Sequence, residues 1–188
     1  MNPNKLTIIF FALVGFVITL PCFAQKSSWI SGQSLLSPDN RYSLKLTFDP
    51  SDISILSGFT ITDTLKGTVF QDDVATPLYS IKWSRDSKTV VFIVHVSGGS
   101  EAAIYHLHND KWFFYLPEPT LGSHFAIIGQ EFKNKGIELS YKVHDKHLEK
   151  FYINTFIFNP ENATRTEEDI KEIDSETYAK LPIFKEKD

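Results

Sequence analysis

The stretch "YSIKWSRDSKTVVFIVHVSGGSEAAIYHL", Tyr79 to Leu107, carries the clearest information about the fold of this 188-residue chain. It predicts a strand, a tight turn at Asp86-Ser87, a second strand, a loop at Gly98-Gly99 and a third strand. Asp, Ser and Gly favour chain reversal, whereas the runs between them are rich in β-branched and aromatic residues. Val90 to Val96 is apolar at nearly every position, which indicates a central strand with both faces buried.

The rest of the chain shows the same succession of strands and short turns. Apolar and polar residues alternate over Tyr42–Phe48 and over Ile137–Val143, which predicts strands with one buried face. Phe151–Phe158 is apolar on both sides. Further strands are expected near residues 58–62, 67–71, 77–83, 102–108 and 112–116. The order of the strands predicts an antiparallel meander.

The C-terminal segment, residues 161–188, is expected to form one short helix and a tail. Thr166 can cap the first N–H groups of such a helix, and the three acidic residues that follow lie where the helix dipole favours negative charge. The apolar stripe and the proline that would end the helix are Ile170, Ile173, Tyr178 and Pro182. We expect this helix to pack on the sheet, and a mobile charged tail is the alternative.

The N-terminus has the pattern of a secretory signal peptide. Lys5 precedes an apolar run from Leu6 to Leu20, and Pro21-Cys22-Phe23-Ala24 supplies small residues before a cleavage site. The sequence therefore predicts a signal peptide over residues 1–24, a β-rich domain over 25–160, and a periplasmic or secreted protein. A membrane anchor and lipidation at Cys22 are the alternatives.

Composition excludes several functions. The chain has 19 Lys and Arg against 23 Asp and Glu, a net charge of −4, and cleavage would remove Lys5 and the single cysteine. The mature chain could then form no internal disulfide or thiolate metal site. Nucleic acids and anionic lipids bind basic surfaces, so an acidic excess disfavours both. We expect no nucleic-acid partner, and no membrane insertion after signal cleavage.

A repeat runs through the chain. The turn Ser84-Arg85-Asp86-Ser87-Lys88 resembles Ser37-Pro38-Asp39-Asn40-Arg41, 47 residues earlier, and more weakly Phe132-Lys133-Asn134-Lys135-Gly136, 48 residues later. A period of about 40–50 residues is typical of four-stranded propeller blades. Residues 79–107 resemble the blade of a TolB-type β-propeller, in which a W-S-P-D-G-K turn joins two strands and a Gly-containing loop leads into an I-Y strand. The matching residues are Trp83, Ser84, Asp86, Lys88, Ile104 and Tyr105, while Arg85 and Ser87 replace Pro and Gly.

The resemblance implies a scaffold for protein contacts. Three units are fewer than the typical four to eight blades of a closed propeller. The expected fold is therefore all-β, mainly an antiparallel meander of blade-like hairpins in a sheet or sandwich, with one short C-terminal helix. The sequence contains neither a G-x-S-x-G nor an H-E-x-x-H motif. We expect an exported non-catalytic binding module whose partner is another exported protein or a cell-envelope component.

Two segments are candidate contact surfaces. The first is the glycine-containing loop, whose backbone groups would be open to a partner: Ser97, Gly98, Gly99, Ser100 and Glu101. It resembles the Ser-Gly loop of exported bacterial lysozyme inhibitors, so an inhibitor of a secreted enzyme is an alternative function. The second is the aromatic run from Trp112 to Tyr115, which must place two rings on each face of a strand. Trp83, by contrast, is expected to be a core anchor.

A histidine pair is the weak candidate for metal chemistry. His106 and His108 are two residues apart on an expected strand, so both imidazoles point to one face and could ligate one ion. Further ligands would have to come from Asp110, His124, His144 or His147. A small hydrolase built on His106 and His108 is therefore a second alternative, although the sequence predicts no cofactor.

Overall fold

The computed structural model describes residues 32–97, 99–121 and 124–182. The expected signal peptide lies outside these residues. The strands are β1 (Ser34–Leu36), β2 (Tyr42–Phe48), β3 (Ile55–Asp63), β4 (Val69–Trp83), β5 (Thr89–Val96), β6 (Gly99–His108), β7 (Lys111–Tyr115), β8 (His124–Lys133), β9 (Gly136–Asp145), β10 (Lys150–Asn159) and β11 (Thr164–Ile173), and they are followed by the helix α1 (Ser175–Lys180). The predicted all-β class with one short C-terminal helix is confirmed.

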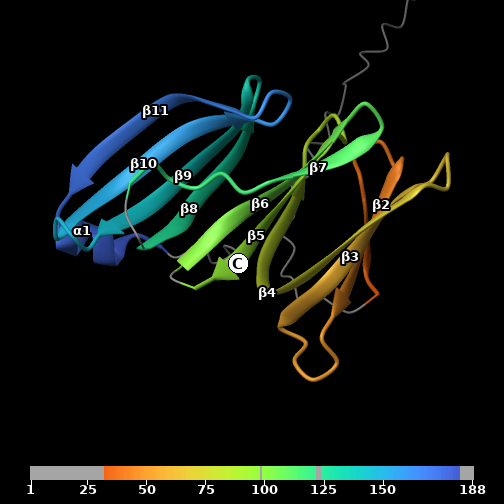
Figure 1. The fold of residues 1–188 in the computed structure, drawn as a ribbon, viewed down its shortest axis with the longest axis horizontal. Helices are drawn as coiled ribbons and strands as arrows, with labels where there is room; N and C mark the ends of the chain where they lie inside the picture. Colours follow the sequence, from red (N-terminus) through yellow and green to blue (C-terminus); the bar gives the residue numbers. More distant parts are fainter. Residues whose placement is uncertain (1–31, 98, 122–123, 183–188) are drawn as a thin grey trace, which may run out of the picture.

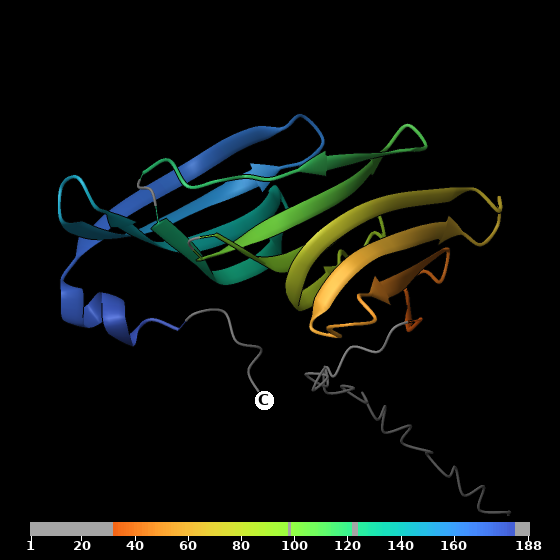
Figure 2. The same ribbon diagram turned by 60° about the horizontal axis from the view of Figure 1, so that its bottom comes forward.

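The strands form three successive four-stranded meanders (Figures 1 and 2). In the first unit, β1, β2 and β3 pair with residues 69–77 of β4, and in the second, residues 78–83 of β4 pair with β5, which is followed by β6 and β7. The third unit is β8 to β11. The strands expected near 67–71 and 77–83 are thus two parts of one long strand that joins two units. The parallel pairing of Ser100 with Ala126 links the second unit to the third.

The second unit lies between two hydrophobic cores. Val90, Phe92 and Tyr105 face the first unit, where they pack with buried residues of β2 and β3. Val91 and Ile104 face the third unit and pack with buried residues of β8, β9 and β10. Successive side chains of a strand point to opposite faces, so the continuously apolar β5 fills both cores. This confirms the prediction of a central strand buried on both sides.

The first two turns of the repeat have the same hydrogen bonds. Ser37 Oγ donates to Asp39 Oδ1 at 2.6 Å and accepts from the Tyr42 N–H at 2.9 Å. In the second turn, Ser84 Oγ donates to Asp86 Oδ1 at 2.6 Å and accepts from Thr89 N–H at 2.9 Å. Ser and Asp therefore satisfy local backbone groups while the chain reverses, as their place in the sequence predicts.

The third turn is built differently. Lys133 pairs with Gly136 across a two-residue connection, and Gly136 has a φ of +147°. A Cβ at this position would lie 2.3 Å from the carbonyl oxygen of Phe158, so the close approach of two backbones requires glycine.

The expected helix from Thr166 is wrong, because residues 164–173 form β11 and pair with β10. The helix α1 begins later, where the Asp174 side chain accepts a hydrogen bond from the Thr177 N–H at 2.7 Å. Tyr178 docks α1 on the third unit through a ring contact with Phe151 at 4.7 Å. The described residues contain no helix with the length and apolar character required to span a bilayer.

Candidate functional site

The predicted contact loop is largely part of the sheet. Ser97 is exposed and Gly98 lies outside the described residues, but Gly99 already belongs to β6. Ser100 and Glu101 are buried, with exposed fractions of 0% and 7%. A Cβ on Gly99 would lie 1.6 Å from the Phe125 carbonyl oxygen, so this glycine is required for packing against β8. The prediction of an open surface loop is wrong for Ser100 and Glu101, because both are buried residues of β6. Ser100 also pairs with Ala126 of β8.

The aromatic strand β7 places its rings in two environments. Trp112 packs against Tyr42 at 5.6 Å and Trp83 at 6.1 Å, and Tyr115 packs against Phe158 at 5.3 Å. The rings that reach solvent are those between them, since Phe113 is 42% and Phe114 51% exposed. Trp112 and Tyr115, the two chosen from the sequence, are therefore the less exposed members of this run, although Phe114 also packs against Tyr105 at 5.0 Å.

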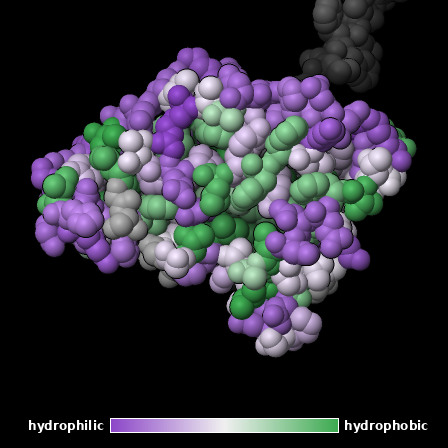
Figure 3. All heavy atoms as spheres, viewed as in Figure 1, coloured by the Kyte–Doolittle hydropathy of each residue, from purple (hydrophilic) through white to green (hydrophobic). Residues whose placement is uncertain are grey.

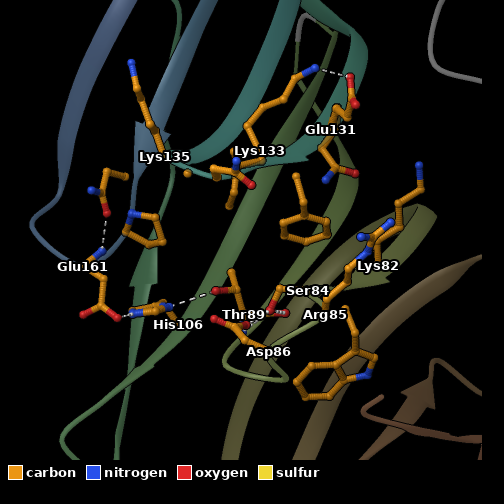
Figure 4. A pocket seen from close by; sticks show the side chains of 18 residues that line it. Lys82, Ser84, Arg85, Asp86, Thr89, His106, Glu131, Lys133, Lys135 and Glu161 are labelled. Atoms are coloured by element: carbon orange, nitrogen blue, oxygen red, sulfur yellow. Dashed lines mark hydrogen bonds and ion pairs between the residues drawn. The ribbon is translucent and has the colours of Figure 1, made fainter. Parts of the chain in front are cut away.

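The histidine pair meets a carboxylate from the third unit. His106 Nε2 lies 3.3 Å from Glu161 Oε1, and His108 Nδ1 lies 2.8 Å from Glu161 Oε2. The ligand atoms of these three residues all lie within 4.8 Å of one another. Thr89 Oγ1 lies 2.9 Å from the other ring nitrogen of His106, Nδ1. Figure 4 shows Thr89, His106 and Glu161 in one line across the end of the sheet.

Burial and charge set the protonation of these groups. Burial lowers the pKa of His106, which outweighs the raising effect of the nearby Glu161 carboxylate. The hydrogen bond with His108 holds the pKa of Glu161 below its ordinary value. At neutral pH the site therefore offers a neutral buried imidazole and an ionised carboxylate.

A pocket of about 740 Å³ opens beside His106 and Glu161. Its walls come from the turn at Ser84, from β8 and from the turn after β10, and they carry Lys82, Arg85, Asp86, Glu131, Lys133 and Lys135 (Figure 4). Lys133 is paired with Glu131 at 2.6 Å. The pocket is thus polar and of mixed charge, with the histidine and Glu161 on one side.

The other residues considered as ligands lie elsewhere. Asp110 pairs with Lys66 at 2.8 Å, and the His144 ring stacks on Phe151 at 4.5 Å. His124 lies opposite His144 on the neighbouring strand, and His147 is exposed in the turn between β9 and β10. The structure therefore joins His106 and His108 to none of these four residues.

Glu161 was not found from the sequence. It follows β10, the third strand of its unit, as His106 and His108 end β6, the third strand of theirs. The repeat period is the signal that could have indicated it, because equivalent strand ends of successive units lie side by side. Linear spacing alone gives no reason to join residues 53 positions apart.

Similarity to known proteins is low. No protein-family model and no curated protein matches this chain. Among solved structures it is similar to a Bacteroides uniformis protein provisionally described as a 6-phosphogluconolactonase, with a TM-score of 0.40 and 12% sequence identity. The match covers 74% of this chain and 42% of that protein, so the matched region is less than half of that protein's length.

Proposed function

We propose that this chain is an exported binding module that holds an extended segment of another exported protein at the free edge of β7. The observation that carries the proposal is the contrast between the outer strands of the three units. The outer part of β4 carries Asp72 and Asp73 and ends at Pro77, and β11 carries six charged residues over Thr164–Ile173. The strand β7 has the sequence Lys-Trp-Phe-Phe-Tyr, with one charge.

An unprotected edge strand is a template for another strand. Proteins normally protect such edges with charged residues or proline, because free N–H and C=O groups pair readily with other chains. Within the described residues β7 pairs with β6 alone, so its other edge is open to strand addition.

Exposed apolar side chains accompany this edge. Phe113 and Phe114 are followed by Leu116, which is 40% exposed. Hydrophobic surface gathers in the middle of this face, over β5, β6 and the end of β7 that lies nearest to them, whereas hydrophilic surface borders the outer part of β7 (Figure 3). Large exposed aromatic groups are the typical anchors of protein interfaces, since their burial contributes most of the binding energy.

The signal peptide pattern and the resemblance to propeller blades support the same function, because such blades serve as scaffolds for protein contacts. The buried Ser100 and Glu101 make the β7 edge a better contact surface than the 97–101 segment of the inhibitor alternative. A small hydrolase is the second candidate, favoured by the approach of His106 and His108 to Glu161 beside a pocket.

Site-specific photo-crosslinking tests the β7 proposal. A photoreactive amino acid replaces Phe114, and the matched control replaces Leu148, which is 60% exposed in the turn between β9 and β10. In the exported fraction we expect one discrete protein adduct at position 114 and none at 148. The identified partner, once purified, should bind the Phe113→Lys variant at least about 30-fold more weakly, the scale of an interface hot spot. Unchanged affinity of Phe113→Lys, or the same adducts at both positions, would contradict the proposal.

A further inference from the structure

We infer that His106, His108 and Glu161 form a binding site for one divalent transition-metal ion, with zinc as the ion that suits it. This site goes beyond the proposed function and does not depend on it. It is built from two units of the fold, since the histidines end β6 and the glutamate follows β10.

The separations of the side chains fit a metal centre. Two ligand atoms bound at about 2.1 Å in a tetrahedral arrangement lie about 3.4 Å apart. His106 Nε2 and Glu161 Oε1 are separated by 3.3 Å, and all three candidate ligand atoms lie within 4.8 Å of one another. A common centre can therefore be reached by small rotations of His108 and Glu161, both of which are about half exposed.

A buried ring nitrogen without a hydrogen bond points into the site. The side chain of His106 is 3% exposed, and its Nε2 makes no hydrogen bond in the described part of the chain, although Glu161 Oε1 lies 3.3 Å away. A buried polar atom without a partner is costly in free energy. Coordination of an ion by the Nε2 lone pair would remove this cost.

A second contact fixes the orientation of this ring. In the tautomer whose Nδ1–H donates to Thr89 Oγ1, 2.9 Å away, the lone pair of His106 lies on Nε2, where the ion would bind. Metal-binding histidines commonly have such a partner for the other ring nitrogen. The backbone of Glu161 is also fixed, since its N–H donates a hydrogen bond to Asn159 Oδ1 at 3.0 Å.

The donor set selects the type of ion. Two imidazoles and one carboxylate suit zinc and its neighbours in the first transition series, whereas magnesium and calcium prefer oxygen ligands alone. Three protein ligands leave a fourth position for water or another ligand, as in open zinc sites. The pocket beside His106 and Glu161 provides the space for it.

Isothermal titration of the purified chain with zinc chloride tests the site. We expect one ion per chain with micromolar or tighter affinity, and no competition from millimolar magnesium. His108→Ala and Glu161→Gln change exposed side chains, so both variants should fold and should bind zinc at least about 100-fold more weakly. His147→Ala is the matched control, because it removes an exposed histidine away from the site and should leave affinity unchanged.

The contact with Thr89 gives a further check. Thr89→Val keeps the shape of the side chain but removes the hydroxyl that orients His106, so it should weaken zinc binding about 10- to 100-fold. A thermal shift with zinc that is present in wild type and absent in Glu161→Gln would agree with this assignment. Absence of stoichiometric binding to wild type, or equal binding by wild type and Glu161→Gln, would overturn it.

Discussion

The first and second units contain the same type of Ser-x-Asp turn, but they differ in the residue that pairs with the first strand residue after this turn. Tyr42 follows the first turn and pairs with Asp63, and Thr89 follows the second and pairs with His106. Asp63 is satisfied within its own unit, because it accepts hydrogen bonds from Arg41 Nε at 3.2 Å and Nη2 at 2.9 Å.

His106 occupies the equivalent position but turns one nitrogen toward the next unit. Its Nδ1 is paired with Thr89, whereas Nε2 faces Glu161 across the boundary between the second and third units. The same backbone position thus carries Asp63, in an ion pair with Arg41, in the first unit, and His106, in a polar site at the boundary with the third unit, in the second. The difference teaches that the repeated turn fixes the geometry, while the side chain opposite it decides whether a ligand can bind.

Of all equivalent positions in the two units, the residue just before the turn should show the largest difference in the free energy of unfolding lost on substitution. Trp83 packs against Tyr42 and Trp112, whereas its counterpart Leu36 is 54% exposed. Trp83→Ala should lower the free energy of unfolding by about 3–5 kcal/mol, because it leaves a cavity in the first core. Leu36→Ala should change it by less than about 0.5 kcal/mol. Urea unfolding of both variants measures the contrast, and equal losses would show that Trp83 is no core anchor.

The serines of the two turns should have similar effects. Ser37→Ala and Ser84→Ala each remove the hydroxyl that accepts from a buried backbone N–H and donates to an aspartate. Leaving the N–H group unsatisfied should lower the free energy of unfolding by about 1–3 kcal/mol in each case. Chemical denaturation is again the measurement. A loss confined to one variant would mean that the turns are alike in geometry but not in energetics.

The smallest expected effect is a difference in the pH range over which His106 and Asp63 change the free energy of unfolding. Burial lowers the pKa of His106 from its ordinary 6.5. As the pH falls, His106 therefore takes up a proton in the unfolded chain before it does so in the folded chain, and the free energy of unfolding decreases below about pH 6.5. Burial alone would raise the pKa of Asp63, but hydrogen bonds from Arg41 and from backbone N–H groups bring it below 3.8. Its stabilisation should be lost only below about pH 4.

Unfolding measured from pH 7 to pH 3 tests this order. His106→Asn should reduce the loss between about pH 6.5 and pH 5, and Asp63→Asn should leave that part of the profile unchanged while reducing the loss at lower pH. Identical profiles for wild type and His106→Asn would mean that His106 titrates alike in the folded and unfolded chain.

The sequence by itself determined most of the strands, two of the turns and the two-sided core, but it did not indicate β1, β8 or β11. These features depend on local chemistry and period: Ser84 and Asp86 bond backbone groups within five residues, and the apolar run of β5 specifies burial on both faces. The tertiary structure decided the rest. Thr166 and the acids after it favour a helix locally, yet the open edge of β10 offered backbone partners and residues 164–173 became β11. Ser100 became buried where β6 pairs with β8, and Glu161 reached His106 and His108 because equivalent strand ends of adjacent units lie together. Such contacts join residues far apart in the chain, so no local pattern contains them.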